Sequence, residues 1–332
     1  MPSPPAPSAS RRALLSGGVA LAAGLAAPRL ARAQGFPDRP IRLLVPYPPG
    51  DGPDVIARSL GEMLQPRLRQ PMVIENQPGA GTTLAAQTLK RAAPDGYTLM
   101  FGGSTSLAVA PALYPRLAYD PVKDFTLVCT VSTSPFALLV RKDGPQDLAA
   151  FVAGAKAKPG SLVYGSAGAG TPHHLLFSIL TQAQGIEAVH VPYRGVTPAL
   201  TDLLAGRIQA TFCHLAAALG FLQNGDLRAL AVTPATRLPA IPDVPTFKEL
   251  GFPGMEDAAW LGLVAPAGLP EPVAERLSRE TVEVVRSEEG RKRIEALFLF
   301  PDPRPYDALR GYVAAEVERW GPIVRASGAE VN

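Results

Sequence analysis

The chain has 332 residues, of which 47% are hydrophobic, and it carries 32 Lys and Arg against 29 Asp and Glu. A chain of this length exceeds the usual size of a single hydrophobic core, so two lobes are expected. With only four histidines and two cysteines, neither a metal site nor a disulfide framework is expected.

The first 33 residues have the features of an export signal. Arg11 and Arg12 precede an apolar run at 13–27, and residues 31–33 offer a cleavage site between small residues. The paired arginines favour the Tat route, with Sec as the alternative. Because the run is shorter than the ~20 apolar residues of a membrane span, we expect cleavage near Ala33 and a periplasmic protein rather than an uncleaved anchor.

Removal of this segment changes the charge of the protein. All four arginines that precede residue 34 belong to the segment, which contains no acid, so 28 basic and 29 acidic residues remain. A near-neutral protein without a basic run is not expected to bind nucleic acid or anionic lipid.

Short apolar segments alternate with helical patterns along the rest of the chain. The expected strands are 41–45, 72–75, 98–102, 125–131, 137–141, 161–165, 188–191, 208–212, 227–232 and 261–265. The expected helices are 54–65, 82–91, 148–156, 173–184, 198–205 and 215–224, followed by a longer helical region at the C-terminus. This alternation predicts an α/β fold with mixed sheets covered by helices.

Two extended segments, 134–140 and 259–266, are interpreted as crossings between lobes. They divide the chain into a discontinuous first lobe, 36–137 with 258–332, and a continuous second lobe, 138–257. Two lobes joined by paired strands are suited to hinge closure over a solute.

A Pro/Gly loop follows the first expected strand. The residues from Val45 to Gly52 lead into the helix that is expected to begin near Asp54. A loop in this position places backbone N–H groups at the mouth of a helix, where they can receive a carboxylate.

A second loop, 165–171, has a similar design. Its small residues let the backbone approach a ligand, and Ser166 and Thr171 add hydroxyl donors. A tight strand-to-helix turn needs glycines whatever it binds, so a purely structural role stays open. The glycines do not form the G-x-G-x-x-G pattern of nucleotide-binding loops, and no cofactor is expected.

These segments resemble the Bug/TctC family, the extracytoplasmic solute-binding proteins of tripartite tricarboxylate transporters. The stretch 45–58 carries the first match, and the others follow in the family's order. They are 73–81, 94–99, 119–125, 190–195, 227–233, 238–246 and 265–268. The resemblance, which runs from about Phe36 to Trp320, implies a type II periplasmic-binding-protein fold, the Venus flytrap. It also implies a protein that captures a small organic carboxylate and delivers it to membrane transporter subunits.

The resemblance further implies the residues of the ligand cleft. They are Tyr47, Pro48, Gly50 and Asp51 of the first loop, Ser104 and Thr105 of a turn after the third strand, Ser166, Ala167, Gly168 and Gly170 of the second loop, and His174 and Tyr193. The family grips a carboxylate with backbone amides, hydroxyls and ordered water. His174 begins a helix, where its ring could equally satisfy loop backbone. Trp260 and Trp320 are expected to pack the hinge and the C-terminal helix.

Asp51 stands where the family usually has a second glycine. A carboxylate in a loop that normally offers bare amides disfavours a second carboxylate on the ligand. We therefore expect a monocarboxylate, or a ligand with an ammonium or hydroxyl groups that Asp51 can accept from. The alternative is that Asp51 points to solvent or caps the helix.

An enzymatic role is not expected. Tyr164 stands two residues before Ser166, so the G-x-S-x-G pattern fails, and no pair of carboxylates stands out as acid and base. A hydrolase and a ligand-dependent sensor that docks on a signalling partner are the alternatives. We expect a monomer without cofactor or metal.

Overall fold

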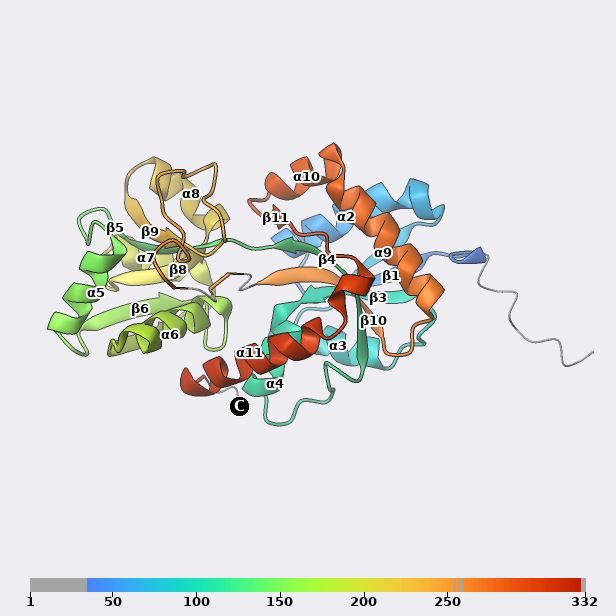
Figure 1. Cartoon of the computed structure of the whole chain (residues 1–332), viewed down its shortest axis with the longest axis horizontal. Helices are drawn as coiled ribbons and strands as arrows, with labels where there is room; N and C mark the ends of the chain where they lie inside the picture. The colour runs from blue at the N-terminus through green and yellow to red at the C-terminus, as the bar shows by residue number, and fades with distance from the viewer. Residues whose placement is uncertain (1–34, 253–254, 257–258, 330–332) are drawn as a thin grey trace, which may run out of the picture.

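The computed structural model describes residues 35–252, 255–256 and 259–329. The predicted export signal lies outside these residues. They form two sheets, each at the centre of one lobe, and the lobes lie side by side (Figure 1). None of the helices in this part of the chain combines the length and the apolar character of a membrane span.

The first sheet has the strand order β11-β4-β10-β3-β1-β2. Its strands are β1 (Ile41–Val45), β2 (Met72–Asn76), β3 (Thr98–Gly103), β4 (Phe125–Thr133), β10 (Trp260–Pro266) and β11 (Phe300–Pro301). β1 pairs in parallel with β2 and β3, whereas β10 is antiparallel to β3 and β4. Apart from the half-buried Arg42, β1 is apolar and buried, as expected of a parallel strand covered on both faces.

The second sheet repeats this arrangement in the order β7-β6-β8-β5-β9. Its strands are β5 (Phe136–Arg141), β6 (Leu162–Ser166), β7 (Ala188–Pro192), β8 (Ala210–His214) and β9 (Leu227–Val232). β6 is parallel to β7 and β8, and β5 is antiparallel to β8 and β9. The α/β prediction with mixed sheets is confirmed, and the ten expected strands are present with ends within two residues of those predicted.

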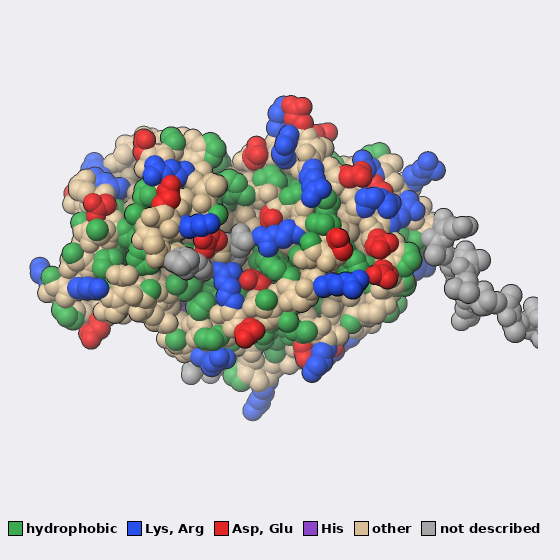
Figure 2. Space-filling view, in the orientation of Figure 1, with side chains coloured by type: hydrophobic (Ala, Val, Ile, Leu, Met, Phe, Trp, Pro, Cys, Tyr) green, Lys and Arg blue, Asp and Glu red, His purple; other side chains and the backbone are tan. Residues whose placement is uncertain are grey.

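Helices cover both sheets. The first lobe has η3 (Ala80–Thr82), α2 (Gly52–Leu68), α3 (Thr83–Lys90), α9 (Glu271–Arg286), α10 (Glu288–Glu295) and η5 (Tyr306–Leu309). The second lobe has α5 (Leu148–Ala157), α6 (Pro172–Gln184), α7 (Val196–Leu204) and α8 (Leu215–Gln223). Positive and negative side chains are interspersed over the face shown in Figure 2.

A helical segment that the sequence did not predict follows β3. The sequence suggested a turn at Ser104, but the chain continues as η4 (Thr105–Val109) and α4 (Ala110–Leu113). Neither helix has a side-chain cap, and a proline falls in the first turn of α4. The usual sequence signals for one continuous helix are therefore missing.

The two crossings between the lobes lie side by side. β4 ends at Thr133 and β5 begins at Phe136, and the backbone N–H of Ser134 donates to the carbonyl of Ala259 over 2.8 Å. β5 thus joins the second sheet two residues before the boundary proposed at 137/138. This pairing ties the segment before β10 to the segment before β5.

The C-terminal helix α11 (Tyr312–Ala326), which the sequence assigned to the first lobe, packs on both lobes. It contacts η4 and α4 on one side and α6 on the other. Its buried Glu316 accepts from the indole Nε1 of Trp260 over 3.1 Å and of Trp320 over 3.3 Å. One buried carboxylate therefore connects the hinge strand β10 to α11. Both tryptophans contribute to this packing, as the sequence predicted.

Candidate functional site

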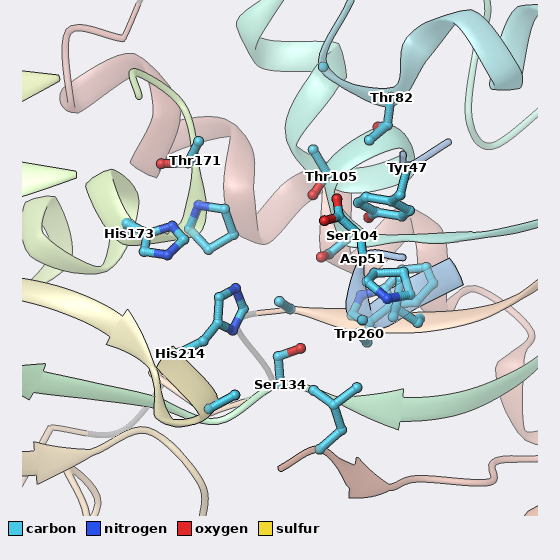
Figure 3. A pocket seen from close by; sticks show the side chains of 18 of the residues that line it. Tyr47, Asp51, Thr82, Ser104, Thr105, Ser134, Thr171, His173, His214 and Trp260 are labelled. Carbon is cyan, nitrogen blue, oxygen red and sulfur yellow. The ribbon is translucent and has the colours of Figure 1, made fainter. Parts of the chain in front are cut away.

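A cavity of about 590 Å³ lies between the two lobes (Figure 3). Most of its wall follows the carboxyl ends of the parallel strands β1, β3, β6 and β8. These residues are Tyr47, Asp51, Gly52 and Pro53 after β1; Ser104 and Thr105 after β3; Ala169, Gly170, Thr171, Pro172 and His173 after β6; and His214, Ala216 and Ala217 at the end of β8 and the start of α8. Ligands of open α/β sheets bind at this edge, and the volume suits a small molecule.

The rest of the wall is largely apolar. It consists of Gly81, Thr82, Leu113, Tyr114, Ser134, Ala259, Trp260, Leu261, Leu297, Phe298 and Leu299. Among the described residues that line the cavity there is no Lys or Arg, and the only carboxylate is that of Asp51. Any charge on a ligand must therefore be met by dipoles, hydroxyls or histidines.

The first-lobe wall is organised by Asp54, a buried residue in the first turn of α2. Its carboxylate accepts from the backbone N–H of Gly50 over 2.9 Å, from Arg58 Nε over 3.0 Å and from Asn76 Nδ2 over 2.8 Å. Burial raises the pKa of Asp54, but these hydrogen bonds outweigh burial, and the pKa lies below its ordinary value. A fixed negative charge thus already occupies the positive end of α2.

Asp51 adds a second acid to the same wall. It holds the N-cap position of α2, but its side chain makes no capping hydrogen bond. Figure 3 shows it beside Tyr47, Ser104 and Thr105. Burial raises the pKa of Tyr47 to about 12, and the charge of Asp51 adds to the rise. This wall consequently combines neutral hydroxyls with one free carboxylate.

The second-lobe wall is formed by the starts of α6 and α8. Neither helix has an acidic residue in its first turn. The first amides of an α-helix have no partner inside the helix, and its N-terminus favours negative charge. No acid therefore occupies the first turn of α6 or α8, in contrast to the first turn of α2.

Two histidines complete this wall. His173 lies in the first turn of α6, and His214 is the N-cap residue of α8. Burial lowers the pKa of His214 to about 4, and burial together with the charge of His214 lowers the pKa of His173 well below its ordinary value. Both rings are neutral at pH 7 and can each donate one N–H.

The predicted site residues divide into two groups. Five of them line the cavity: Tyr47, Asp51, Ser104, Thr105 and Gly170. Seven do not belong to its wall: Pro48, Gly50, Ser166, Ala167, Gly168, His174 and Tyr193. Gly170 has φ +73°, and a Cβ added there would lie 2.5 Å from the side chain of Leu113, so this position requires glycine.

Several residues of the second group hold the loop after β6 in shape. The Ser166 hydroxyl is completely buried, lies 2.7 Å from His190 Nε2, and accepts from the backbone N–H of Gly168 over 3.1 Å. His174 Nδ1 accepts from the N–H of Gly170 over 3.2 Å, and its ring stacks on His190 with centroids 3.9 Å apart.

Tyr193 likewise has a partner away from the cavity, because its hydroxyl donates to Asp202 over 2.7 Å. The structure thus favours the structural alternative for His174 that the sequence left open. Ser166, His174 and His190 position Gly170 rather than lining the cavity themselves.

Sequence reasoning missed His173, His214 and the start of α8. His173 and His174 are adjacent, and the pattern did not indicate which ring faces the cavity. His214 follows a strand that was predicted to end at residue 212. The signal that could have found them is the repeated arrangement of the two sheets. β8 holds the place in the second sheet that β3 holds in the first, so the residues that follow β8 should line the cavity as those after β3 do.

The fold and the cavity between lobes define a two-lobed solute-binding protein. The chain matches the family described as "Tripartite tricarboxylate transporter family receptor" over residues 56–329, and it belongs to this family. It is 35% identical to Protein BugT of Bordetella pertussis over 312 residues, which cover 93% of this chain and 95% of that protein. The resemblance to the Bug/TctC family is confirmed, and the family is one of periplasmic binding proteins.

Solved structures agree with this assignment. Rpa4515 of Rhodopseudomonas palustris, described with adipate, has a TM-score of 0.75 at 32% identity, covering 89% of this chain and 100% of that one. MatC from the same organism, described with bound malate, has a TM-score of 0.71 at 35% identity, covering 87% and 100%. A TctC solute-binding protein from Polaromonas has a TM-score of 0.78 at 26% identity, covering 87% and 99%. The family and the fold are those of binding proteins.

Proposed function

We propose that this protein captures a small organic carboxylate between its lobes in the periplasm and delivers it to a tripartite tricarboxylate-type transporter, without catalysing a reaction. The observation that carries the proposal is the cavity at the carboxyl ends of four parallel strands, where the starts of α6 and α8 carry no acid. Such ends receive a carboxylate. The adipate and malate described with two relatives support this ligand class.

The uneven charge of the two walls suggests how the ligand lies. A carboxylate belongs at the second-lobe wall, away from Asp51. A hydroxyl or ammonium group belongs at the first-lobe wall, where Asp51 can accept its hydrogen bond. Hydroxy acids and amino acids fit this arrangement better than a simple dicarboxylate, whose second carboxylate would approach Asp51.

A carboxylate panel tests the proposal. Citrate, succinate, lactate, amino acids and benzoate are screened by thermal shift, and those that bind are titrated by calorimetry. Small-angle scattering with and without the tightest ligand tests closure. Absence of binding by every acid, with stabilisation by an unrelated class of solute, would overturn the proposal.

Hydrolysis has little support from the site. Ser166 contacts His190, but its hydroxyl is completely buried and stands outside the cavity wall. A nucleophile must reach the substrate, so this pair is poorly placed for attack. Turnover of generic esters that disappears in Ser166→Ala would contradict the proposal.

The partner is tested separately. Pulldown with and without ligand distinguishes delivery to transporter subunits from docking on a signalling protein. The predicted signal at 1–33 supports export, and the mass of the mature protein purified from the periplasm tests cleavage near Ala33.

A further inference from the structure

His173 carries two ring nitrogens that nothing in the described chain satisfies. The side chain is 6% exposed, yet neither Nδ1 nor Nε2 has a hydrogen-bond partner among the described residues. An unpaired buried polar group costs roughly 1–3 kcal/mol. Because His173 lines the cavity, a ligand that hydrogen-bonds to it would remove this cost.

His214 lies next to His173 on the same wall. The two rings meet edge to face with centroids 5.0 Å apart, and Phe136 packs against both at 5.1 and 4.1 Å. Figure 3 shows both rings on the second-lobe side, across the cavity from Asp51. Two neutral imidazoles on an apolar support thus stand at the starts of α6 and α8.

The surroundings favour an acceptor with a negative charge. The first-turn amides of Ala216 and Ala217 accompany the two rings, and neither helix start has an acid. A carboxylate in this place would favour the charged form of a neighbouring imidazole. No Lys or Arg is among the described residues that line the cavity, so a protonated histidine is the group that can balance the charge of the carboxylate.

Several other ionisable groups of the elements around this wall are neutral or have partners. They are Tyr114 after α4, Arg141 on β5, Tyr164 on β6, Asp202 on α7, Cys213 on β8, Arg228 on β9, and Glu316 and Arg319 on α11. Arg141 pairs with Asp143, Asp202 with Arg207, and Glu316 with Arg319. Arg228 donates to the carbonyl of Gly144. After burial, a proton on His214 is what lowers the pKa of His173.

We infer that the space between the first turns of α6 and α8 is a carboxylate subsite in which His173 and His214 donate ring N–H groups, and that one of these rings takes up a proton as the ligand binds. The inference rests on the proposed function and assigns the carboxylate end of the ligand to the second lobe. The proton comes from solvent and stays on an imidazole nitrogen, so no covalent bond of the ligand changes.

Calorimetry across pH tests the subsite. The probe is whichever of lactate, succinate, glutamate and benzoate gives the largest thermal shift, with its amide as the neutral control. For the acid, Kd should fall as the pH falls from 8 to 5, by up to about tenfold per pH unit for one proton. Titrations at pH 6.5 in MES and in Bis-Tris, which differ in ionisation enthalpy, should reveal proton uptake with the acid and none with the amide.

Substitutions locate the proton. His173→Gln and His214→Gln should each weaken acid binding at pH 6 by roughly tenfold or more, and the variant that lacks the ring that takes up the proton should also lose the uptake. Lys156→Gln is the control, because Lys156 is an exposed charged residue of α5 in the same lobe and does not line the cavity. It should retain both the affinity and the proton uptake. Thermal melting checks that each variant is folded. Weakened acid binding in either folded cavity variant supports the subsite.

The outcomes separate the subsite from the proposed function. Acid binding with a pH-independent Kd and no proton uptake would overturn the subsite and leave the solute-binding role intact. Unaltered binding and uptake in both cavity variants would do the same. Failure of every acid to bind at any pH would overturn both.

Discussion

The two walls of the cavity are built on the same plan and carry opposite chemistry. In each lobe a central parallel strand leads through a loop into a helix that starts at the cavity, β1 into α2 and β6 into α6. Asp54 occupies the first turn of α2 and Asp51 precedes it, whereas the first turn of α6 has no acid and contains His173. Topology brings helix ends to the cavity, and the side chains of the first turn decide whether an end is free for an anion.

The contrast extends to titration. All four histidines of the chain, His173, His174, His190 and His214, belong to the second lobe. Burial lowers the pKa of each. The second lobe should therefore respond to mild acid while the first does not.

The largest effect is expected when the first turn of α8 receives an acidic residue, as the first turn of α2 has, because the two walls then no longer differ in charge. Ala217→Asp places a carboxylate in the first turn of α8, where Ala217 is exposed on the cavity wall. Repulsion should weaken carboxylate binding by roughly a hundredfold or more, ~3 kcal/mol. An acid near a helix start should also stabilise the free protein by ~0.3–1 kcal/mol.

Calorimetry and thermal melting measure the two effects of Ala217→Asp. Ala149→Asp, in the first turn of α5 and away from the cavity, is the matched control and should leave the affinity unchanged. Undiminished binding by Ala217→Asp would place the ligand elsewhere.

Lowering the pH should increase the difference between the lobes, because it should destabilise the second lobe before the first. A histidine with a lowered pKa binds fewer protons in the folded than in the unfolded state, so its stabilising contribution is present above pH ~6.5 and is lost as the pH falls toward about 4. The free energy of unfolding should fall between pH 7 and 4.5, by up to ~1.4 kcal/mol per pH unit for each histidine.

Hydrogen exchange at pH 7 and pH 5, corrected for intrinsic rates, shows where this acid effect begins. We expect β6, α6 and β8 to lose protection before β1, β3 and α2. Loss of protection in the first lobe first would contradict the assignment of the acid effect to the histidines.

Removing the free acid of the first wall should make the two walls more alike. Asp51→Asn keeps the size of the side chain and removes its charge, which should improve succinate binding about tenfold, ~1.4 kcal/mol. Binding of hydroxy acids and amino acids should weaken instead. Equal succinate affinity in wild type and variant would mean that Asp51 points to solvent, the alternative that the sequence left open.

Ser166→Ala should have the smallest effect on ligand binding. The hydroxyl bonds with His190 and the backbone of Gly168 rather than lining the cavity. Its removal should lower the free energy of unfolding by ~1–3 kcal/mol and change the affinity less than threefold. Urea unfolding measures the loss of stability, and calorimetry measures the affinity. A tenfold loss of affinity without a loss of stability would support the sequence-based hypothesis that Ser166 contacts the ligand.

The alternation of apolar strands with helical patterns was enough to predict the two mixed sheets, because each strand is a short apolar segment with clear breakers. The loops after β1 and β6 were also visible, since glycine and proline indicate tight turns wherever they occur. Tyr47 and Gly170 illustrate this success, as both lie in those loops and on the cavity wall. Their contact with a ligand stays a prediction.

The helical segment from Thr105 to Leu113 could not be predicted in the same way. It packs against α11, which is about 200 residues further along the chain, so its stability comes from a distant contact rather than from local signals. Trp260 was expected only to pack the hinge. In the structure its indole donates to Glu316, and the residue also lines the cavity.

The sequence by itself determined the order of the ten expected strands and the six expected helices, the loops that lead into α2 and α6, and the family, because these depend on local patterns of apolar residues, glycine and proline. Only the tertiary structure decided that His173 rather than His174 faces the cavity, since successive helical residues point about 100° apart and the packing of α6 selects the face. It also brought His214 and the start of α8 beside His173, 41 positions apart in the chain. The parallel pairing of β6 with β8 places their carboxyl ends at the same edge, and this long-range pairing is what assembles the second wall.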